Sequence, residues 1–363
     1  MRRVPPTRAG VAGPTRRGVP VPRALVGVLV VGLVGALVAA AAGGPGTASA
    51  VGEPGARDAD GVRPVGTLTR MFVDRSRRTP ADVSAGIPPA RERVLPTTIY
   101  YPARGSPGTV TERAKPARGR YPLVLFSPGA PGTPHDYEVL LADWAAHGYV
   151  VVAPTFPISS VAGPDAAAWK DLPAQTKDVR FVLDRVLALD PHRAGTARID
   201  DERIAVAGHS FGGATALSLV SRCCRDHRFD AVVALAAVAE TEHGPALKRP
   251  VGPILFVHAE GDRAVPYRDA AGLCRTAEGR RRFLTVKEIR GLRAHVDPYV
   301  GDDRYAAVVR PAIVDFLDGY LRGEAAARRR LDRAGAGTTV ATMSRCPAAR
   351  ATPPTAPTTP SAG

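Results

Sequence analysis

Short, continuous runs of apolar residues recur through the middle of the chain and alternate with longer segments of helical periodicity. The apolar runs of strand length are Pro122–Phe126, Tyr149–Ala153, Arg203–Ala207, Ala231–Ala236, Pro253–His258 and Arg282–Ile289, with two earlier strands at Gly66–Val73 and Pro96–Tyr101. Helical spacing marks His135–Ala146, Gln175–Leu189, Phe211–Arg222, Tyr267–Glu278 and Arg304–Leu321. Strands that are apolar throughout are buried on both faces. The alternation therefore predicts an α/β fold with a mostly parallel sheet covered by helices on both sides.

The pattern divides the chain into four expected parts. Residues 1–50 carry an export signal, and residues 51–65 form a flexible start of the mature protein. Residues 66–330 hold the α/β domain, in which no long apolar insertion indicates a large cap domain. Residues 331–363 are rich in Ala, Thr and Pro, a composition typical of a disordered tail.

The N-terminus has the order of segments that export signals share. Residues 1–23 are basic, residues 24–42 are apolar without interruption, and Ala48-Ser49-Ala50 has the small residues of a cleavage site. We expect cleavage after Ala50 and a secreted protein. The apolar run is also long enough to cross a bilayer as an uncleaved anchor, so a membrane-anchored form stays open as the alternative. Membrane contact is expected only through this segment.

The charge of the chain changes this picture little. The 363 residues include 49 Lys and Arg against 34 Asp and Glu, a net charge of +15. Six of the arginines and none of the acidic residues fall in residues 1–50, which leaves an excess of nine over the remainder. The remaining arginines alternate with acidic residues, and no nucleic-acid-binding motif accompanies them. The composition therefore predicts a solvated, Arg-rich surface on a monomer, without a nucleic-acid partner.

Ser210 is the candidate nucleophile. It lies in the segment Gly-His-Ser-Phe-Gly, directly after an apolar strand and directly before a helix. A nucleophile elbow needs this order, because the turn is so tight that only glycine fits two residues before and two residues after the serine. The serine side chain would project at the carboxyl edge of the sheet, beside the N-terminus of the helix.

The acid and the base follow the serine along the chain in this arrangement. Asp262 comes after a turn glycine at the end of a late strand, and Glu260 is the alternative acid. His295 is expected in a loop between the last strand and the last helix, which would lay its imidazole over Ser210. In these roles His295 takes the serine proton, and Asp262 orients the imidazole and stabilises the imidazolium.

Two backbone N–H groups are needed for an oxyanion hole. Phe211 follows the nucleophile and supplies one. The second is expected from the loop after the strand Pro122–Phe126, where Ala130 is the first candidate and Gly129 the next, since Pro131 has no N–H. Around this centre the candidate substrate-pocket residues are Gly129, Phe156, Trp169 and His209.

The segment Gly208–Thr215, with the sequence GHSFGGAT, resembles the elbow of the platelet-activating-factor acetylhydrolase-like esterases in the α/β-hydrolase superfamily. A resemblance to secreted bacterial esterases and lipases of the same superfamily extends over residues 66–322. It implies hydrolysis of carboxylic esters with short or medium acyl chains, or of lipid-like esters. It also implies catalysis by Ser210, Asp262 and His295 with no cofactor and no metal.

Other functions of this fold stay open. Cutinases and polyester hydrolases place an aromatic residue after the Pro-Gly of the oxyanion loop, where this chain has Ala130, and another in the loop corresponding to 238–243, which has none here. An amidase or an acyltransferase would use the same three residues. A non-catalytic binding protein on this scaffold is the expectation least favoured by an intact set of Ser, Asp and His.

Four cysteines suit an exported protein, and they allow three disulfide pairings. They are Cys223, Cys224, Cys274 and Cys346. A bond between the adjacent pair would close a strained ring, so separate partners are expected for Cys223 and Cys224.

Overall fold

The structure is a computed structural model, and it describes the chain from residue 62 onward with a few gaps. The described residues are 62–82, 85–161, 166–221, 224–239, 247, 252–301 and 304–348. The expected export signal, its apolar run and the end of the C-terminal tail therefore lie outside the described residues. Within the part that is described, no helix is both long enough and apolar enough to cross a membrane.

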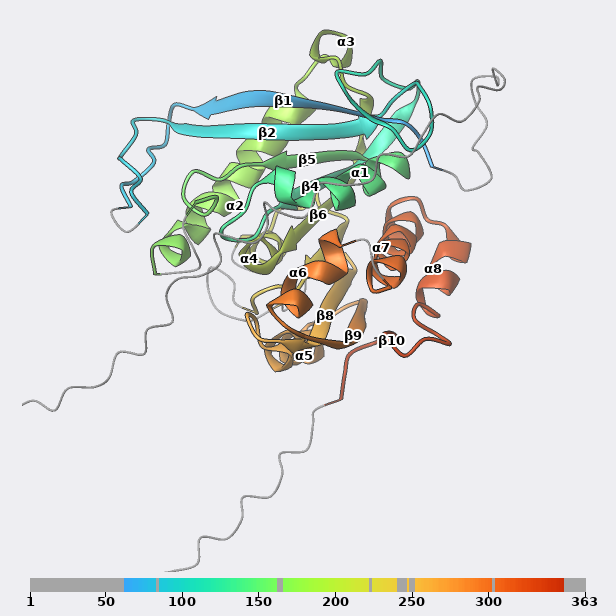
Figure 1. Cartoon of the computed structure of the whole chain (residues 1–363). Helices are drawn as coiled ribbons and strands as arrows, with labels where there is room; N and C mark the ends of the chain where they lie inside the picture. The colour runs from blue at the N-terminus through green and yellow to red at the C-terminus, as the bar shows by residue number, and fades with distance from the viewer. Residues whose placement is uncertain are drawn as a thin grey trace, which may run out of the picture. The chain divides into compact units, whose positions relative to one another are not determined.

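One mixed sheet runs through the described domain, with the strand order β10-β9-β8-β7-β6-β4-β5-β2-β1-β3 (Figure 1). The strands are β1 (Val65–Asp74), β2 (Arg93–Pro102), β3 (Val110–Glu112), β4 (Arg120–Ser127), β5 (Val150–Pro154), β6 (Arg198–His209), β7 (Ala231–Leu235), β8 (Ile254–Asp262), β9 (Arg281–Gly291) and β10 (Ala341–Ser344). The strands from β5 to β9 pair in parallel, whereas β2 pairs with β1 and β5, and β10 with β9, in antiparallel fashion.

Helices cover both faces of this sheet (Figure 1). They are α1 (Glu138–Ala146), which follows the 3-10 turn Pro134–Tyr137, α2 (Ala166–Leu187), α3 (Pro191–Ala194), α4 (Ser210–Ser218), α5 (Tyr267–Thr276), α6 (Leu292–Val300), α7 (Ala306–Leu321) and α8 (Ala325–Leu331). Side chains of α1, α6 and α7 build the core on one face, and those of α2, α4 and α5 build it on the other. The predicted fold class is confirmed.

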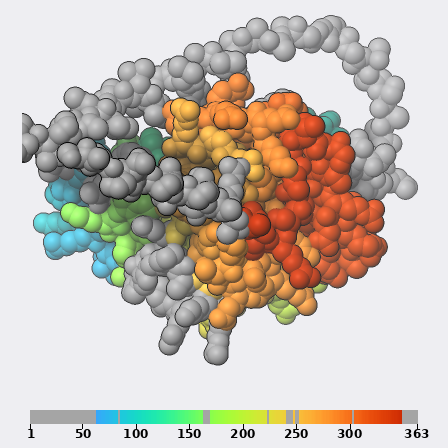
Figure 2. Space-filling view, turned by 90° about the horizontal axis from the view of Figure 1, so that it is seen from below, coloured from blue at the N-terminus to red at the C-terminus, as the bar shows by residue number. Residues whose placement is uncertain are grey.

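The C-terminal end differs from the expectation. Its composition predicts a disordered tail from residue 331, but β10 lies inside that segment and pairs with β9. Val340 and Ala341 are buried there, so two apolar residues of the segment join the core. In Figure 2 the red C-terminal end lies directly against the orange part of the chain. Pairing with an edge strand is the physical reason that composition alone misled here.

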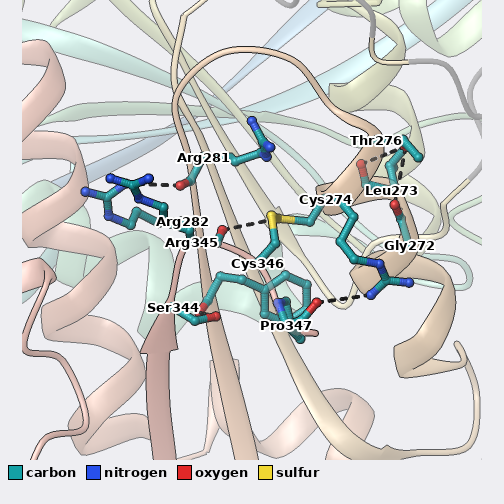
Figure 3. Close-up of a disulfide and its surroundings, with 12 residues drawn as sticks. Gly272, Leu273, Cys274, Thr276, Arg281, Arg282, Ser344, Arg345, Cys346 and Pro347 are labelled. Carbon is teal, nitrogen blue, oxygen red and sulfur yellow. Dashed lines mark hydrogen bonds between the residues drawn. A yellow bond between two sulfur atoms is a disulfide. The ribbon is translucent and has the colours of Figure 1, made fainter. Parts of the chain in front are cut away.

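A disulfide fastens this end to the domain. Cys346, just after β10, is bonded to Cys274 of α5, with the two Cα atoms 5.8 Å apart (Figure 3). Cys224 is disulfide-bonded as well. Because Cys274 and Cys346 pair with each other, neither is the partner of Cys224. Cys223 lies outside the described residues.

Candidate active site

The candidate catalytic residues all follow parallel strands at the same edge of the sheet. Ser210 comes directly after β6, Asp262 ends β8, and His295 follows β9. The loop with Ala130 follows β4, the neighbour of β6. Since the strands from β4 to β9 are parallel, their carboxyl ends converge, and open α/β sheets bind their ligands at this edge.

Ser210 stands in a strained backbone conformation at the strand-to-helix turn. Its φ is 53°, in the left-handed region that non-glycine residues seldom adopt. A Cβ placed on Gly208 would lie 2.1 Å from the carbonyl oxygen of Gly212. A Cβ on Gly212 would lie 2.0 Å from the carbonyl oxygen of Ser127, at the end of β4. The two glycines of the motif are thus needed for close backbone approach, as the elbow geometry requires.

Asp262 and His295 form a buried hydrogen-bonded pair. The Nδ1 of His295 lies 2.7 Å from Oδ2 of Asp262, and because a carboxylate only accepts, Nδ1 carries the proton. The backbone N–H groups of Ala264 and Val265 donate to the other carboxylate oxygen, at 2.8 and 3.0 Å. Glu260, the alternative acid, is exposed, so the structure brings Asp262 and not Glu260 to the imidazole.

The electrostatics of Asp262 suit a permanently ionised acid. Burial opposes ionisation of this carboxyl, but hydrogen bonds from His258 and His295 outweigh burial and lower its pKa. The Nε2 of His258 lies 3.3 Å from the same Oδ2 that His295 contacts, and 3.0 Å from the carbonyl oxygen of Val265. His258 precedes the acid along the chain, and only the folded chain shows it against Asp262.

His295 was expected in a loop, but it lies in the first turn of α6. The helix begins at Leu292, directly after β9 ends at Gly291. Gly291 has a φ of 75°, which lets the chain turn from strand into helix without a connecting loop. The imidazole is therefore carried by a rigid element, with 9% of the residue exposed.

The loop after β4 lies against the nucleophile. A Cβ on Gly129 would come within 3.2 Å of the Cβ of Ser210. The N–H of Gly129 already donates to the hydroxyl of Tyr137, at 3.0 Å. This leaves the Ala130 N–H, next along the chain, as the better candidate for the second oxyanion donor beside Phe211.

A small apolar cluster adjoins these donors. Phe211 packs with Leu172 and Ala214, and three partly buried residues cover this group: Ala130, Trp169 and Val238. The Trp169 ring meets the Phe211 ring edge-on, with the centroids 5.0 Å apart. Phe156 behaves differently from the expectation, because it packs in the large core between the sheet and α2, with only 1% of its surface exposed.

His209, also expected near the pocket, is almost completely buried, and both of its ring nitrogens contact protein atoms. Its Nδ1 lies 2.8 Å from the hydroxyl of Tyr137, and its Nε2 lies 2.7 Å from the carbonyl oxygen of His295. Tyr137 was not singled out from the sequence. The one signal that could have found it is its place along the chain, shortly after the oxyanion loop and at the start of a helix.

Comparisons with known proteins agree with this geometry. A family model described as Chlorophyllase matches residues 102–256. Cutinase est2 of Thermobifida alba is 32% identical over 125 residues, which are 34% of this chain and 34% of that protein. Platelet-activating factor acetylhydrolase of Bos taurus is 25% identical over 182 residues, which are 39% of this chain and 40% of that protein. The chain thus matches at most about two fifths of the length of these curated relatives.

A solved structure extends the likeness over most of the domain. The ferulic acid esterase from Streptomyces cinnamoneus superposes with a TM-score of 0.54 and 28% sequence identity, covering 72% of this chain and 91% of that one. The sheet, the elbow and these matches show that the chain has the α/β-hydrolase fold, and the proteins it resembles include cutinases, an acetylhydrolase and a ferulic acid esterase.

Proposed function

We propose that this protein is an exported serine hydrolase that cleaves carboxylic esters. The observation that carries the proposal is the buried Asp262–His295 pair, at 2.7 Å, on the same sheet edge as the elbow serine. A hydrogen-bonded acid and imidazole beside a strained serine form the acid–base–nucleophile set of acyl transfer. The cutinase, acetylhydrolase and esterase relatives support the same reaction class.

The first half of the reaction acylates the serine. Ser210 Oγ attacks the ester carbonyl carbon while His295 Nε2 takes the hydroxyl proton. The negative charge that develops on the carbonyl oxygen is stabilised by the N–H groups of Phe211 and Ala130. When the tetrahedral intermediate collapses, the bond to the alkoxy oxygen breaks, and His295 returns the proton to the departing alcohol.

The second half releases the acid. A water molecule gives a proton to His295 and attacks the acyl carbon, which forms a second tetrahedral intermediate in the same oxyanion hole. Collapse of this intermediate returns the proton to Ser210 Oγ and frees the carboxylic acid. Asp262 keeps its negative charge throughout, and it holds Nδ1 protonated so that Nε2 faces the serine.

The acyl group is proposed to lie against Trp169 and Val238, the partly buried residues that cover Phe211. This surface is small and apolar, and it is continuous with the Ala130 donor. Such a wall suits short acyl chains and flat aromatic acyl groups, since Trp169 presents an aromatic ring beside the reacting carbon.

The test is turnover of p-nitrophenyl esters of increasing chain length and of a methyl hydroxycinnamate, with wild type beside Ser210→Ala. We expect the variant to lose at least 10³-fold in kcat. His192→Ala is the matched control for His295→Ala, because His192 is an exposed histidine away from the site. Unchanged turnover in Ser210→Ala would refute the mechanism, and so would equal activity of the two histidine variants.

A polyester substrate is the second candidate, and the cutinase matches favour it. The oxyanion loop speaks against a polyester substrate, because it has Ala130 where cutinases have an aromatic residue. Trp169, which packs against Phe211 from α2, supplies an aromatic side chain at the site from a different segment. Release of soluble acid from an aromatic polyester film, measured beside the p-nitrophenyl esters, separates the two: no release from the film assigns the enzyme to soluble esters.

Export is proposed from the N-terminal pattern, and the disulfides suit an oxidising compartment. Expression of the full chain in a bacterial host, followed by mass analysis of the product in the medium, tests it. A secreted product that begins at Val51 supports cleavage after Ala50. An intact product held in the membrane fraction supports the anchored alternative.

A further inference from the structure

We propose that Tyr137 and His209 are positioning residues. They are joined in one hydrogen-bond chain that holds the oxyanion loop and the catalytic histidine in fixed positions relative to Ser210. This inference rests on the proposed ester hydrolysis. The chain runs from the Gly129 N–H through the Tyr137 hydroxyl and the His209 ring to the carbonyl of His295. It therefore connects the loop after β4 with α6 beyond β9, two segments that the sequence separates widely.

The direction of every hydrogen bond in this chain is determined by one end. The carbonyl oxygen of His295 can only accept, so the Nε2 of His209, at 2.7 Å, must carry a proton. Burial, together with the neighbouring His295, lowers the pKa of His209 to about 3, so the ring is neutral and its Nδ1 has no proton.

Nδ1 of His209 is therefore an acceptor, and the Tyr137 hydroxyl, at 2.8 Å, must be its donor. Burial raises the pKa of Tyr137, so this hydroxyl keeps its proton. Its oxygen then accepts from the N–H of Gly129, at 3.0 Å. For a neutral His209, no other arrangement of protons satisfies all three contacts, so the chain admits a single tautomer of this ring.

Packing makes the chain rigid. Tyr137 and His209 are 7% and 3% exposed, and their rings lie in contact, with centroids 5.5 Å apart. The ring of His209 also lies 4.6 Å from that of His295 and 5.1 Å from that of Tyr299. A side-chain shift at either positioning residue would thus move the backbone of His295 or the loop that offers the Ala130 donor.

Two consequences for the reaction follow. The Gly129 N–H is taken up by Tyr137 and is turned away from the oxyanion, so the loop presents the Ala130 N–H in a defined place. The carbonyl of His295 accepts a hydrogen bond from His209, the residue next to the nucleophile. The catalytic base and Ser210 therefore keep a fixed position relative to each other. Neither positioning residue exchanges a proton with the substrate.

The first arm of the test deletes one hydroxyl. Tyr137→Phe retains the ring but breaks the chain, and we expect kcat to fall on the order of 10- to 100-fold with little change in KM, as a small misplacement of reacting groups costs. Tyr299→Phe is the matched control: it also removes a buried hydroxyl beside His209, one that donates to Val257 instead. Equal kcat values for the two variants, at equal thermal stability, would overturn the proposal.

The second arm tests the two nitrogens of the His209 ring separately. A glutamine places its NH2 where the imidazole Nε2 lies and can still donate to the His295 carbonyl, whereas an asparagine reaches only the Nδ1 place. We expect His209→Gln to retain more of the wild-type kcat than His209→Asn. The reverse order, or equal losses, would contradict the positioning of His295.

The third arm needs no substrate. Imidazole nitrogen–proton correlations in the nuclear magnetic resonance spectrum of the full chain report the tautomer of His209. The proposal requires the Nε2–H form in wild type and a change of the His209 signals in Tyr137→Phe. An Nδ1–H form would overturn the chain even in an active enzyme. Conversely, an Nε2–H form in a protein that cleaves no ester would refute the proposed function and leave the hydrogen-bond chain standing.

Discussion

Two buried polar networks hold this molecule together, and they are built on opposite principles. The imidazole network consists of Asp262, His295, His209 and Tyr137, a single carboxylate joined to two imidazoles and a phenol. The arginine network joins Arg93 and Arg77 to Asp171 and Asp178 by ion pairs, and Arg77 also pairs with Asp74. The first lies where the parallel strands end, and the second joins the start of β2 to α2.

The arginine network is a structural anchor. Arg93 is completely buried, with its Nε 2.7 Å from Asp178 and its Nη2 2.8 Å from Asp171. From α2 the contacts continue through Gln175, which accepts from the hydroxyl of Thr215 in α4, at 2.9 Å. Paired charges therefore hold α2 against β2, and a neutral hydrogen bond links α2 to α4, the helix that begins with Ser210.

The two kinds of network are expected to serve different ends, stability in one case and reaction rate in the other. Breaking a buried ion pair leaves an uncompensated charge, so damage to the arginine network should appear as lost stability. In the imidazole network each donor has one acceptor in one tautomer, so damage there should appear mainly as lost rate. The two carboxyls differ accordingly: burial raises the pKa of Asp178 to about 6, whereas hydrogen bonds from histidines outweigh burial and lower that of Asp262.

The largest effect is expected from Asp262→Asn. The amide favours the wrong tautomer of His295, and kcat should fall on the order of 10⁴-fold, about 5.5 kcal/mol in the barrier. Steady-state kinetics with a p-nitrophenyl ester measures it. Glu260→Gln is the matched control at the exposed acid, and it should retain activity. If Glu260→Gln were the inactive variant, the acid would have been assigned to the wrong residue.

Arg93→Met should lower the free energy of unfolding by about 3–5 kcal/mol, because Asp171 and Asp178 lose their shared partner inside the protein. Urea unfolding at neutral pH measures the loss. Arg120→Met is the control at an exposed ion pair with Asp201, and it should cost no more than about 1 kcal/mol. Similar losses in both variants would show that the arginine network is no anchor.

Trp169→Ala tests the aromatic side chain that α2 places against Phe211. Removal of the aromatic wall should lower kcat/KM for the preferred acyl group on the order of tenfold and leave the shortest ester less affected. Trp169→Phe should restore part of the loss. A uniform loss over all esters would mean that Trp169 acts on the fold of α2 and not on the acyl group.

The smallest effect concerns pH. With a pKa of about 6 against an ordinary 3.8, Asp178 keeps its proton in the folded state after the unfolded chain has lost it. Its contribution to stability therefore falls as pH rises through this window. Asp262 has the opposite sign: its contribution is present above pH 3.8 and is lost as pH falls below that value.

Urea unfolding of wild type and Asp178→Asn at several pH values isolates the first of these two carboxyls. Relative to the variant, wild type should become less stable between pH 4 and pH 6. A constant difference across this range would show that Asp178 is ionised throughout, as a purely charge-paired carboxyl would be.

The apolar runs predicted the parallel strands and most of the helices, since the folded sheet buries these runs on both faces. The same strands placed Ser210 and Asp262 at one edge. The short elements were missed, among them α6, α8 and β10, because the patterns are too brief or too polar to stand out. His295 was assigned to a loop for this reason, although its contact with Asp262 agrees with the predicted order of the triad residues.

The elbow and the order of nucleophile, acid and base could be predicted from the sequence, because they depend on local turn chemistry and on strands that must be buried. Which donor meets which acceptor in the hydrogen-bond chain followed only from the tertiary structure. Tyr137, His209 and His295 come from three distant segments, and no local pattern records that a carbonyl of one will need a donor from another. The tautomer of His209 and the pairing of Cys274 with Cys346 both arise from such long-range contacts.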